Sequence, residues 1–352
     1  MAKKLLLLLF VFSGFASNAF AQIGGKQTFQ FLELPTGAKT AAIGGVNITS
    51  SGEDVTMMQS NPALLTSEME NRLAFTYNNY LADIAQHNLN YAFKAGKTGT
   101  WGASLTYLNY GDFIERDETG LEQGTFSVKD YAFGITKSTT IDNYTLGATA
   151  KVAVSDIAGY SSTALLADVG GVFKHPEQDL VIGLMLKNIG YQLSAFNGQD
   201  REPMPFDAQL GVSYKLEHMP LRFSTTVHHL HQWDIVYLDP NKKGRLDEDS
   251  NEIKEKKTFA DKLSRHFVFG GEFLLSKNLN ARVGYNHLRR RELRLEEKSG
   301  GAGLSFGLML RIKAFQLDYS RAYYHVAGAG NYFSITTDFN SLFKKKEADT
   351  VL

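Results

Sequence analysis

The sequence contains no cysteine and only seven prolines among its 352 residues. Without cysteine the chain forms no disulfide bonds and carries no lipid on a cysteine side chain. Proline is kept out of the interior of β-sheets, so its scarcity beside abundant glycine, phenylalanine and tyrosine favours strands over helices. The fold must therefore be stabilised without covalent cross-links.

A net charge is also lacking, since 37 basic residues balance 37 acidic ones. The chain has no single-sign field to attract a polyanion, which excludes nucleic acid as its partner. The mean hydropathy is mildly negative. Soluble proteins and transmembrane β-barrels share that average, because only every second strand residue of a barrel faces lipid.

Only the N-terminus carries a long apolar run, at residues 5–15, behind Lys3 and Lys4 and before a small-x-small site at residues 19–21. This order predicts a secretory signal peptide at residues 1–21, with cleavage before Gln22. A retained membrane helix would need about 20 apolar residues. Serine, glycine and asparagine at residues 13–18 interrupt the run before that length is reached.

The segment FDAQLGVSYKL at residues 206–216 alternates between apolar and polar side chains. A strand sorts these residues onto two faces, with Leu210 on one and Gln209 on the other, whereas a helix scatters them. Such segments run about 10 to 14 residues, enough to cross a bilayer at a tilt. We predict fourteen of them, at residues 71–81, 85–95, 99–111, 125–138, 142–155, 160–174, 179–191, 204–216, 220–235, 264–276, 278–289, 301–311, 313–325 and 330–340.

The links between these segments differ in length. If the first strand runs outward, every second link should be a short periplasmic turn, and the links there are short: 95–98, 138–142, 175–178, 217–220, 276–278 and 311–313. The opposite set contains the long links 112–124, 192–204, 236–261 and 289–300. We therefore predict an all-β, transmembrane antiparallel β-barrel of about 14 strands at residues 71–340, in the outer membrane of a Gram-negative bacterium, with a periplasmic tail at 341–352. A secreted β-sandwich explains neither the strand lengths nor the unequal links.

The string GLSFG at residues 303–307 matches the G-x-S-x-G pattern of hydrolase nucleophiles. That pattern requires a helix directly after the serine, and Ser305 instead lies within an alternating strand. We predict no catalytic residue and no enzymatic activity.

His229 and His231 fall on one face of the predicted strand 220–235 and could hold a metal. A third ligand at a suitable spacing is missing, and rings such as those of histidine and Trp233 also suit the membrane–water boundary of a barrel. We predict no metal site and no cofactor.

Two charged loops allow further interpretations. Residues 239–250 begin like a calcium loop, but Lys243 occupies a ligand position and Ser250 replaces the closing glutamate, so a solvated loop is favoured. The arginines of residues 289–298 could bind lipopolysaccharide phosphates, although the balanced charge also fits a solvated loop.

Residues 22–70 are rich in glycine and threonine, yet include large apolar side chains that a free tail would not need. We predict that this segment is an N-terminal plug, or hatch, in the barrel lumen. Its predicted motif is Asn61, Pro62 and Ala63, a rigid turn with a structural role that redirects the chain toward the first strand.

The strings GAKTAAIGG (37–45), GEDV (52–55) and SNPALL (60–65) resemble the N-terminal signature of the FadL-type outer-membrane barrels. The resemblance implies fourteen strands and an N-terminal hatch. Further strings are similar to the branch of that family in the type IX (Por) secretion system of Bacteroidota, and the match runs from about residue 22 to 339: FQFLELPTGAKTAAIGGVNIT, NRLAFTYNNYLADI, YGDF, DETG, VIGLMLKNIGYQL, REPMPFDAQLGVSYKLEHMPLRFS and HHLHQWD.

By resemblance, the chain would anchor a PorZ-like surface partner beside the PorU–PorV sortase pair, which attaches secreted cargo to lipopolysaccharide. Two alternatives stay open: a FadL-like conduit for hydrophobic small molecules and, more weakly, an outer-membrane lipid hydrolase. The resemblance transfers no catalytic or binding residue, because the family signature marks the hatch and the strands.

Overall fold

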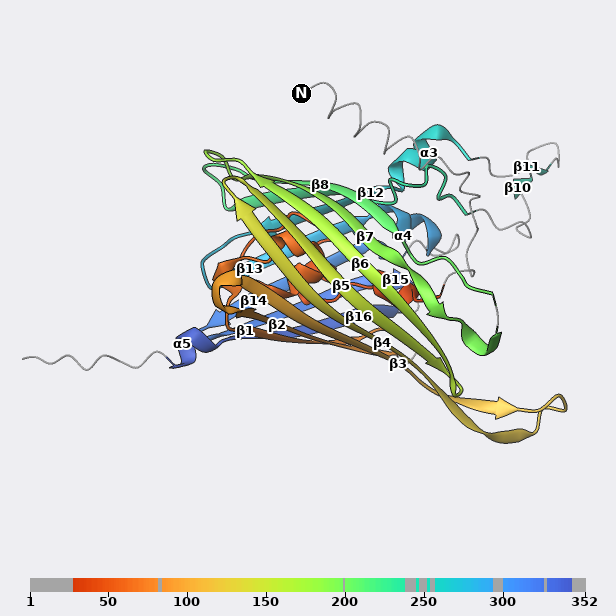
Figure 1. Ribbon diagram of the computed structural model, residues 1–352. Coiled ribbons are helices and arrows are strands. Elements are labelled where there is room, and N and C mark those ends of the chain that lie inside the picture. Colours follow the sequence, from red (N-terminus) through yellow and green to blue (C-terminus); the bar gives the residue numbers. More distant parts are fainter. Residues whose placement is uncertain are drawn as a thin grey trace, which may run out of the picture.

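The protein is described by a computed structural model that covers residues 28–81, 84–198, 200–237, 245–246, 252–253, 257–293, 300–325 and 328–343. Within these residues, fourteen strands close into one antiparallel barrel, shown in Figure 1. In ring order they are β1 (Arg72–Asn79), β2 (Ala85–Lys94), β3 (Thr100–Arg116), β4 (Glu122–Ile141), β5 (Tyr144–Ile157), β6 (Tyr160–Lys174), β7 (Leu180–Ser194), β8 (Asp207–Lys215), β9 (Leu221–Val227), β12 (Phe267–Phe273), β13 (Leu279–Asn286), β14 (Leu304–Ile312), β15 (Phe315–His325) and β16 (Gly328–Asp338). Strand β16 pairs with β1 to close the ring. The predicted 14-strand barrel is confirmed.

The two faces of each strand divide the side chains as the alternation predicts. Leu210 on β8 points outward and is 46% exposed, whereas the adjacent Gln209 points inward and is 5% exposed. Large apolar side chains cover the outside of every part of the ring, among them Phe75, Leu105, Phe133, Leu146, Leu184, Phe306, Leu317 and Phe333. Such a surface is stable only against lipid, so it fits a barrel that spans a membrane.

The two ends of the barrel differ. At one end, which we call the turn end, the links are short: 95–99, 142–143, 175–179, 216–220, 274–278 and 313–314. The opposite end, which we call the loop end, carries the long links 195–206, 228–266 and 287–303. The predicted alternation of short and long links is incomplete, because the link of residues 158–159 at the loop end is a two-residue turn.

The predicted loop at 112–124 is largely strand. β3 and β4 continue past the barrel as a two-stranded hairpin, with Phe113 opposite Phe126 and the turn at residues 117–121. Beyond Asn109 and Val128, neither strand forms ladder pairs with a third strand among the described residues. Figure 1 shows this hairpin reaching beyond the other strands, at the end opposite α5.

Several predicted strands end early, where a turn or a helix begins. The strand predicted at 220–235 stops at Val227, and His229 adopts a left-handed backbone with φ 56°. Asn286 ends β13 and accepts a hydrogen bond from the Arg289 amide at 2.9 Å, which starts a helix where the sequence predicted a strand to residue 289.

The helical elements are short. Those of the wall and links are η5 (Gly96–Thr98), η6 (Phe196–Gly198), α3 (Phe259–Ser264), α4 (His287–Glu292) and α5 (Phe339–Phe343), so the strand predicted at 330–340 also ends early. A separate pair, β10 (Arg245–Leu246) and β11 (Glu252–Ile253), lies in the link after β9. Among the described residues, no helix is both long and apolar enough to cross a membrane.

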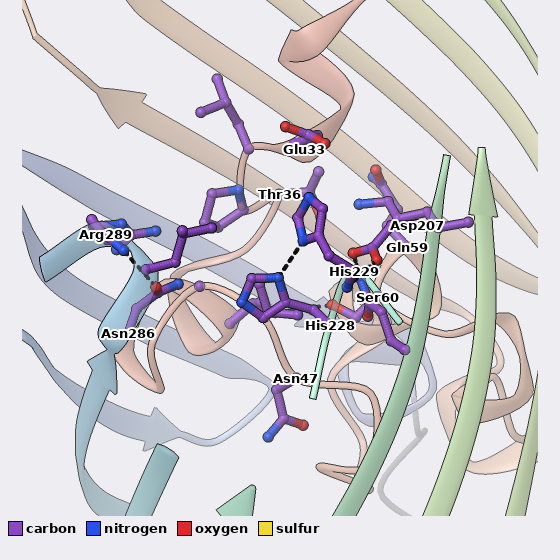
Figure 2. Close-up of a pocket in the computed structure, with 18 of the residues that line it drawn as sticks. Glu33, Thr36, Asn47, Gln59, Ser60, Asp207, His228, His229, Asn286 and Arg289 are labelled. Carbon is purple, nitrogen blue, oxygen red and sulfur yellow. Dashed lines mark hydrogen bonds between the residues drawn. The ribbon is translucent and has the colours of Figure 1, made fainter. Parts of the chain in front are cut away.

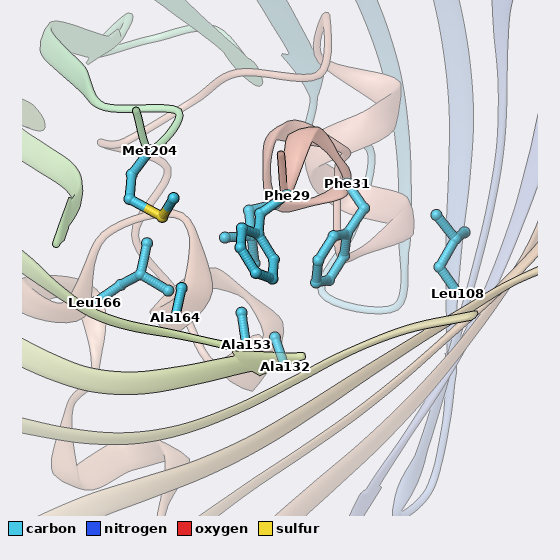
Figure 3. Packing of buried hydrophobic residues seen from close by; sticks show 9 residues of the cluster. Phe29, Phe31, Leu108, Ala132, Ala153, Ala164, Leu166 and Met204 are labelled. Carbon is cyan, nitrogen blue, oxygen red and sulfur yellow. The ribbon is translucent and has the colours of Figure 1, made fainter. Parts of the chain in front are cut away.

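The N-terminal segment of the described chain lies inside the barrel as η1 (Gln30–Glu33), α2 (Ala38–Ala42), η2 (Val55–Gln59), η3 (Pro62–Leu64) and η4 (Ser67–Met69). Figure 3 shows Phe29 and Phe31 packed against the wall, where Ala132, Ala153 and Ala164 face them. The small alanine side chains leave the space that the two rings fill.

Helix α2 is held where the barrel closes. Ser334 on β16 accepts a hydrogen bond from the Ala38 amide at 3.0 Å, and its hydroxyl also lies 2.7 Å from that of Thr76 on β1. On β14, the Ser305 hydroxyl donates to the Ala42 carbonyl at 2.9 Å. Ser305 is fully buried within a strand and binds the N-terminal segment, so the G-x-S-x-G string forms no nucleophile turn.

Charged side chains fill part of the remaining lumen. Arg282 on β13 forms ion pairs with Glu272 on β12, at 3.4 Å, and with Asp318 on β15. Glu272 also pairs with Arg222 and accepts a hydrogen bond from the Ser50 hydroxyl at 2.8 Å. This luminal charge network joins four strands of the wall to the N-terminal segment.

The predicted signal peptide at 1–21, the calcium-like segment at 239–250 apart from Arg245 and Leu246, and the tail from residue 344 lie outside the described residues.

Candidate functional site

The motif predicted from sequence, Asn61, Pro62 and Ala63, forms the start of η3 inside the barrel. Asn61 is fully buried, and its side-chain oxygen accepts the Ala63 amide at 3.0 Å. Its side-chain nitrogen donates to the carbonyl of Ile48 at 3.1 Å and reaches that of Leu184 on β7 at 3.5 Å. Pro62 occupies the first helical position, where its missing amide costs no hydrogen bond.

Two glycines of the wall leave room for this turn. A Cβ atom at Gly147 on β5 would overlap the backbone of Pro62, and one at Gly170 on β6 would overlap the side chain of Asn61. The turn therefore lies directly on the backbone of two adjacent strands. After the turn, the chain passes through η4 before β1 begins at Arg72.

Substituting Gly170 with valine is expected to lift the Asn61 turn off the wall. Overpacking of this kind costs about 1–3 kcal/mol, and displacement of the segment should open the lumen to ions. Conductance in planar bilayers should therefore rise, and the unfolding midpoint in urea should fall. Gly171→Val is the matched control, since its side chain points outward, where a Cβ meets only Leu146 at 3.4 Å. If both variants match the wild type, the turn does not seal the barrel.

A cavity of about 240 Å³ lies between the N-terminal segment and the wall at the loop end. Figure 2 shows the side chains around it, among them Glu33, Asp207, His228, His229, Asn286 and Arg289. Pockets for drug-sized ligands are typically larger, roughly 300–1,000 Å³, and mostly apolar. This cavity therefore suits an ion or a small polar molecule.

The histidines lie where the chain leaves β9. His228 is 2% exposed, and its Nδ1 atom lies 2.5 Å from Nδ1 of His229. The His229 amide donates to the Asp207 carboxylate at 2.6 Å, and Gln209 donates to the other carboxylate oxygen at 2.6 Å. Burial, reinforced by the neighbouring His229, lowers the pKa of His228 well below its ordinary value. His228 is therefore a neutral imidazole at pH 7, with a lone pair on its ring.

On another side of the cavity, Arg289 packs against the barrel wall. The Arg289 guanidinium lies over the ring of Tyr324, 4.2 Å from its centre, and Tyr80 meets Tyr324 edge-on at 4.6 Å. Arg291 forms an ion pair with Asp261 of α3 at 3.0 Å. Two arginines of the segment 289–298, which was considered for lipopolysaccharide binding, thus have partners within the protein. Residues 294–298 of that segment lie outside the described residues.

Sequence reasoning found only part of this cluster. It placed His229 and His231 on a strand face, which is wrong, because both lie in the loop after β9 and His231 is exposed. It also missed Asp207 and His228. The pairing of Leu210 with Val227 brings the start of β8 beside the end of β9. A correct prediction of this register would therefore have placed Asp207 beside His228.

Comparison with known proteins gives a family and a fold. The model of UPF0164, an uncharacterised protein family, matches residues 13–204. The toluene transporter TbuX of Ralstonia pickettii is similar in structure, with 14% identity, a TM-score of 0.51, and coverage of 87% of this chain and 99% of that one. A FadL homologue of Pseudomonas aeruginosa matches with 11% identity and a TM-score of 0.48, over 86% and 98% of the two chains. No curated protein matches the sequence. At such low identity the likeness to TbuX shows the fold alone, and that fold agrees with the resemblance to FadL-type barrels.

Proposed function

We propose that this chain, which belongs to the UPF0164 family, is a plugged outer-membrane barrel that anchors a partner protein at the cell surface. Short turns face the periplasm in outer-membrane barrels, so the loop end faces outward.

The proposed anchor function rests mainly on the β3–β4 hairpin. Its strands have 17 and 20 residues, whereas about 9–11 residues suffice to cross the membrane. Its apolar side chains are uncovered, with Ile114 53% and Leu121 67% exposed. Unpaired strand edges and exposed apolar side chains are the features by which a sheet recruits another chain.

Contacts within the hairpin also hold its shape. Phe113 stacks on Phe126 with ring centres 5.4 Å apart. At the tip, the Asp117 carboxylate accepts hydrogen bonds from the amides of Thr119 and Leu121 at 2.9 and 3.0 Å. A preformed surface loses little conformational entropy on binding.

The proposed partners follow from resemblance. The strings described above are similar to those of PorQ in the type IX secretion system, and DETG, one of those strings, forms the hairpin tip. The proposed partners are therefore a PorZ-like surface protein, beside the PorU–PorV sortase pair, and lipopolysaccharide as the acceptor of the cargo.

The test is to replace residues 112–126 with an Asn-Gly turn in the native organism. The barrel should still insert and still migrate faster on gels before boiling, because a closed barrel resists detergent. The PorZ-like partner should appear in the medium, and cargo attachment should fail.

A milder variant, Ile114→Ser, should weaken partner retention. Tyr160→Ser is its control, because Tyr160 is also 53% exposed but lies on the barrel wall. The anchor is refuted if a variant that lacks the hairpin, and in which residues 192–204 and 236–261 are also shortened, still retains the partner and displays cargo.

The second candidate is a FadL-like conduit for hydrophobic small molecules, which the fold shared with a toluene transporter favours. The small volume of the cavity and the charged side chains in its lining, such as Glu33, Asp207 and Arg289, count against it. Uptake of radiolabelled toluene separates the two functions. A conduit shows altered uptake in Gly170→Val or Asn61→Ala cells, because the N-terminal segment is displaced, and it keeps cargo attachment when the hairpin is removed.

A further inference from the structure

The start of the long link between β9 and β12 brings metal-binding groups together. One ligand atom from each of Asp207, His228 and His229 lies within 4.8 Å of the others. Figure 2 shows both imidazole rings and the carboxylate at the edge of the cavity. Asp207 is 6% exposed and His228 2% exposed, so these groups are shielded from bulk water.

Two features of this cluster point to a ligand. The Nε2 atom of His228 is buried and has no hydrogen-bond partner within the described part of the chain. A buried imidazole nitrogen without a partner is costly, because it has lost its water. In addition, His229 adopts a left-handed backbone, φ 56°, and strained backbone of this kind is concentrated at functional sites.

We propose that Asp207, His228 and His229 bind a divalent transition-metal ion of the zinc class, with its remaining coordination position open to the cavity. Two imidazoles and one carboxylate are a ligand set for such ions, and three protein ligands leave a position for water or another small ligand. Calcium and magnesium prefer ligand sets made of oxygen atoms, so they should not compete. The proposal does not depend on the anchor function.

The surrounding residues already hold these ligands. Gln209 donates to one oxygen of Asp207, and the His229 amide donates to the other. The His228 carbonyl lies 2.7 Å from Nδ1 of His266, the residue that precedes β12. Partners of this kind orient metal ligands and raise affinity, commonly by roughly 10- to 100-fold.

A bound metal ion would stabilise the position of the long link at residues 228–266. Its ligands come from the start of β8 and the exit of β9, and the His228–His266 contact joins that exit to the return of the chain. A bound ion would thus fix both ends of residues 228–266 to the barrel, because it favours only the conformation in which all three ligands meet.

The experiment is titration of Zn²⁺ into the purified full-length barrel in detergent, after chelator treatment, followed by calorimetry. We expect one ion per chain in the wild type. Asp207→Asn keeps the shape and the hydrogen bond from the His229 amide, yet should weaken binding by more than about 100-fold, because losing a ligand exceeds the loss of an outer partner. His228→Gln should do the same.

His218→Ala is the control, because His218 is exposed at the turn end, and it should bind as the wild type does. Faster gel migration before boiling shows that each variant is folded. Cobalt(II) absorption gives a second readout, since a site with nitrogen ligands changes the spectrum of the ion. The proposal is overturned if the folded wild type binds no Zn²⁺, if Ca²⁺ competes equally, or if both ligand variants bind as the wild type does.

Discussion

Replacing Arg282 with methionine is expected to cost about 3–5 kcal/mol of the free energy of unfolding, the usual cost of removing one partner of a buried ion pair. Arg282 is 5% exposed and pairs with Glu272 and Asp318 in the lumen. Methionine keeps much of the side-chain volume but removes the positive charge beside the carboxylates of Glu272 and Asp318. The measurement is the midpoint of urea unfolding for the barrel folded in lipid.

Arg311→Met is the matched control. Arg311 pairs with Glu53 at 3.0 Å, but the two side chains are 31% and 38% exposed, so water screens the pair and the loss should be about 0–1 kcal/mol. Adding Asp318→Asn to Arg282→Met should restore part of the stability, because one uncompensated charge disappears. Equal midpoints for Arg282→Met and Arg311→Met would contradict the assigned role of the luminal charge network.

Leu210→Arg is expected to impair assembly far more than Gln209→Arg, although the two residues are adjacent on β8. The Leu210 side chain faces lipid, where an arginine near the bilayer centre costs roughly 2–4 kcal/mol. Gln209 faces the lumen beside Asp207, which can pair with an arginine. The readout is the fraction of each variant that reaches the folded, heat-modifiable form in the outer membrane.

Leu210→Ala is the control for lost apolar contact, and it should fold nearly as well as the wild type because lipid replaces the missing atoms. Comparable yields of Leu210→Arg and Gln209→Arg would mean that this face of β8 is not in contact with lipid.

Sequence predicted the barrel well because the membrane imposes a strict rule on each strand. Lipid outside and a packed lumen inside force an alternation that Leu210 and Gln209 obey, and closure forces an even number of strands. The strand count and the facing of the side chains were therefore readable without the structure. Strand ends were not, because single capping residues such as Asn286 decide them.

The hairpin and the cavity could not be predicted for different reasons. Residues 112–124 are charged and polar enough to read as a loop, and only backbone pairing beyond the membrane makes them strands. The cavity depends on the contact between Asp207 and His229, which are 22 residues apart and meet only through the register of one hairpin. The sequence around Asp207 does not indicate a contact with His229, and the sequence around His229 does not indicate one with Asp207.

The position of Ser334 bears on how the protein is assembled. The segment that fills the lumen is synthesised first, yet Ala38 binds Ser334 on the last strand, and Ser334 also touches Thr76 on the first. Ser305 on β14 holds the other end of α2, but the Ala38 contact is complete only when β16 has met β1. Closure of the wall therefore completes the binding of the N-terminal segment, and that segment in turn stabilises the closed ring.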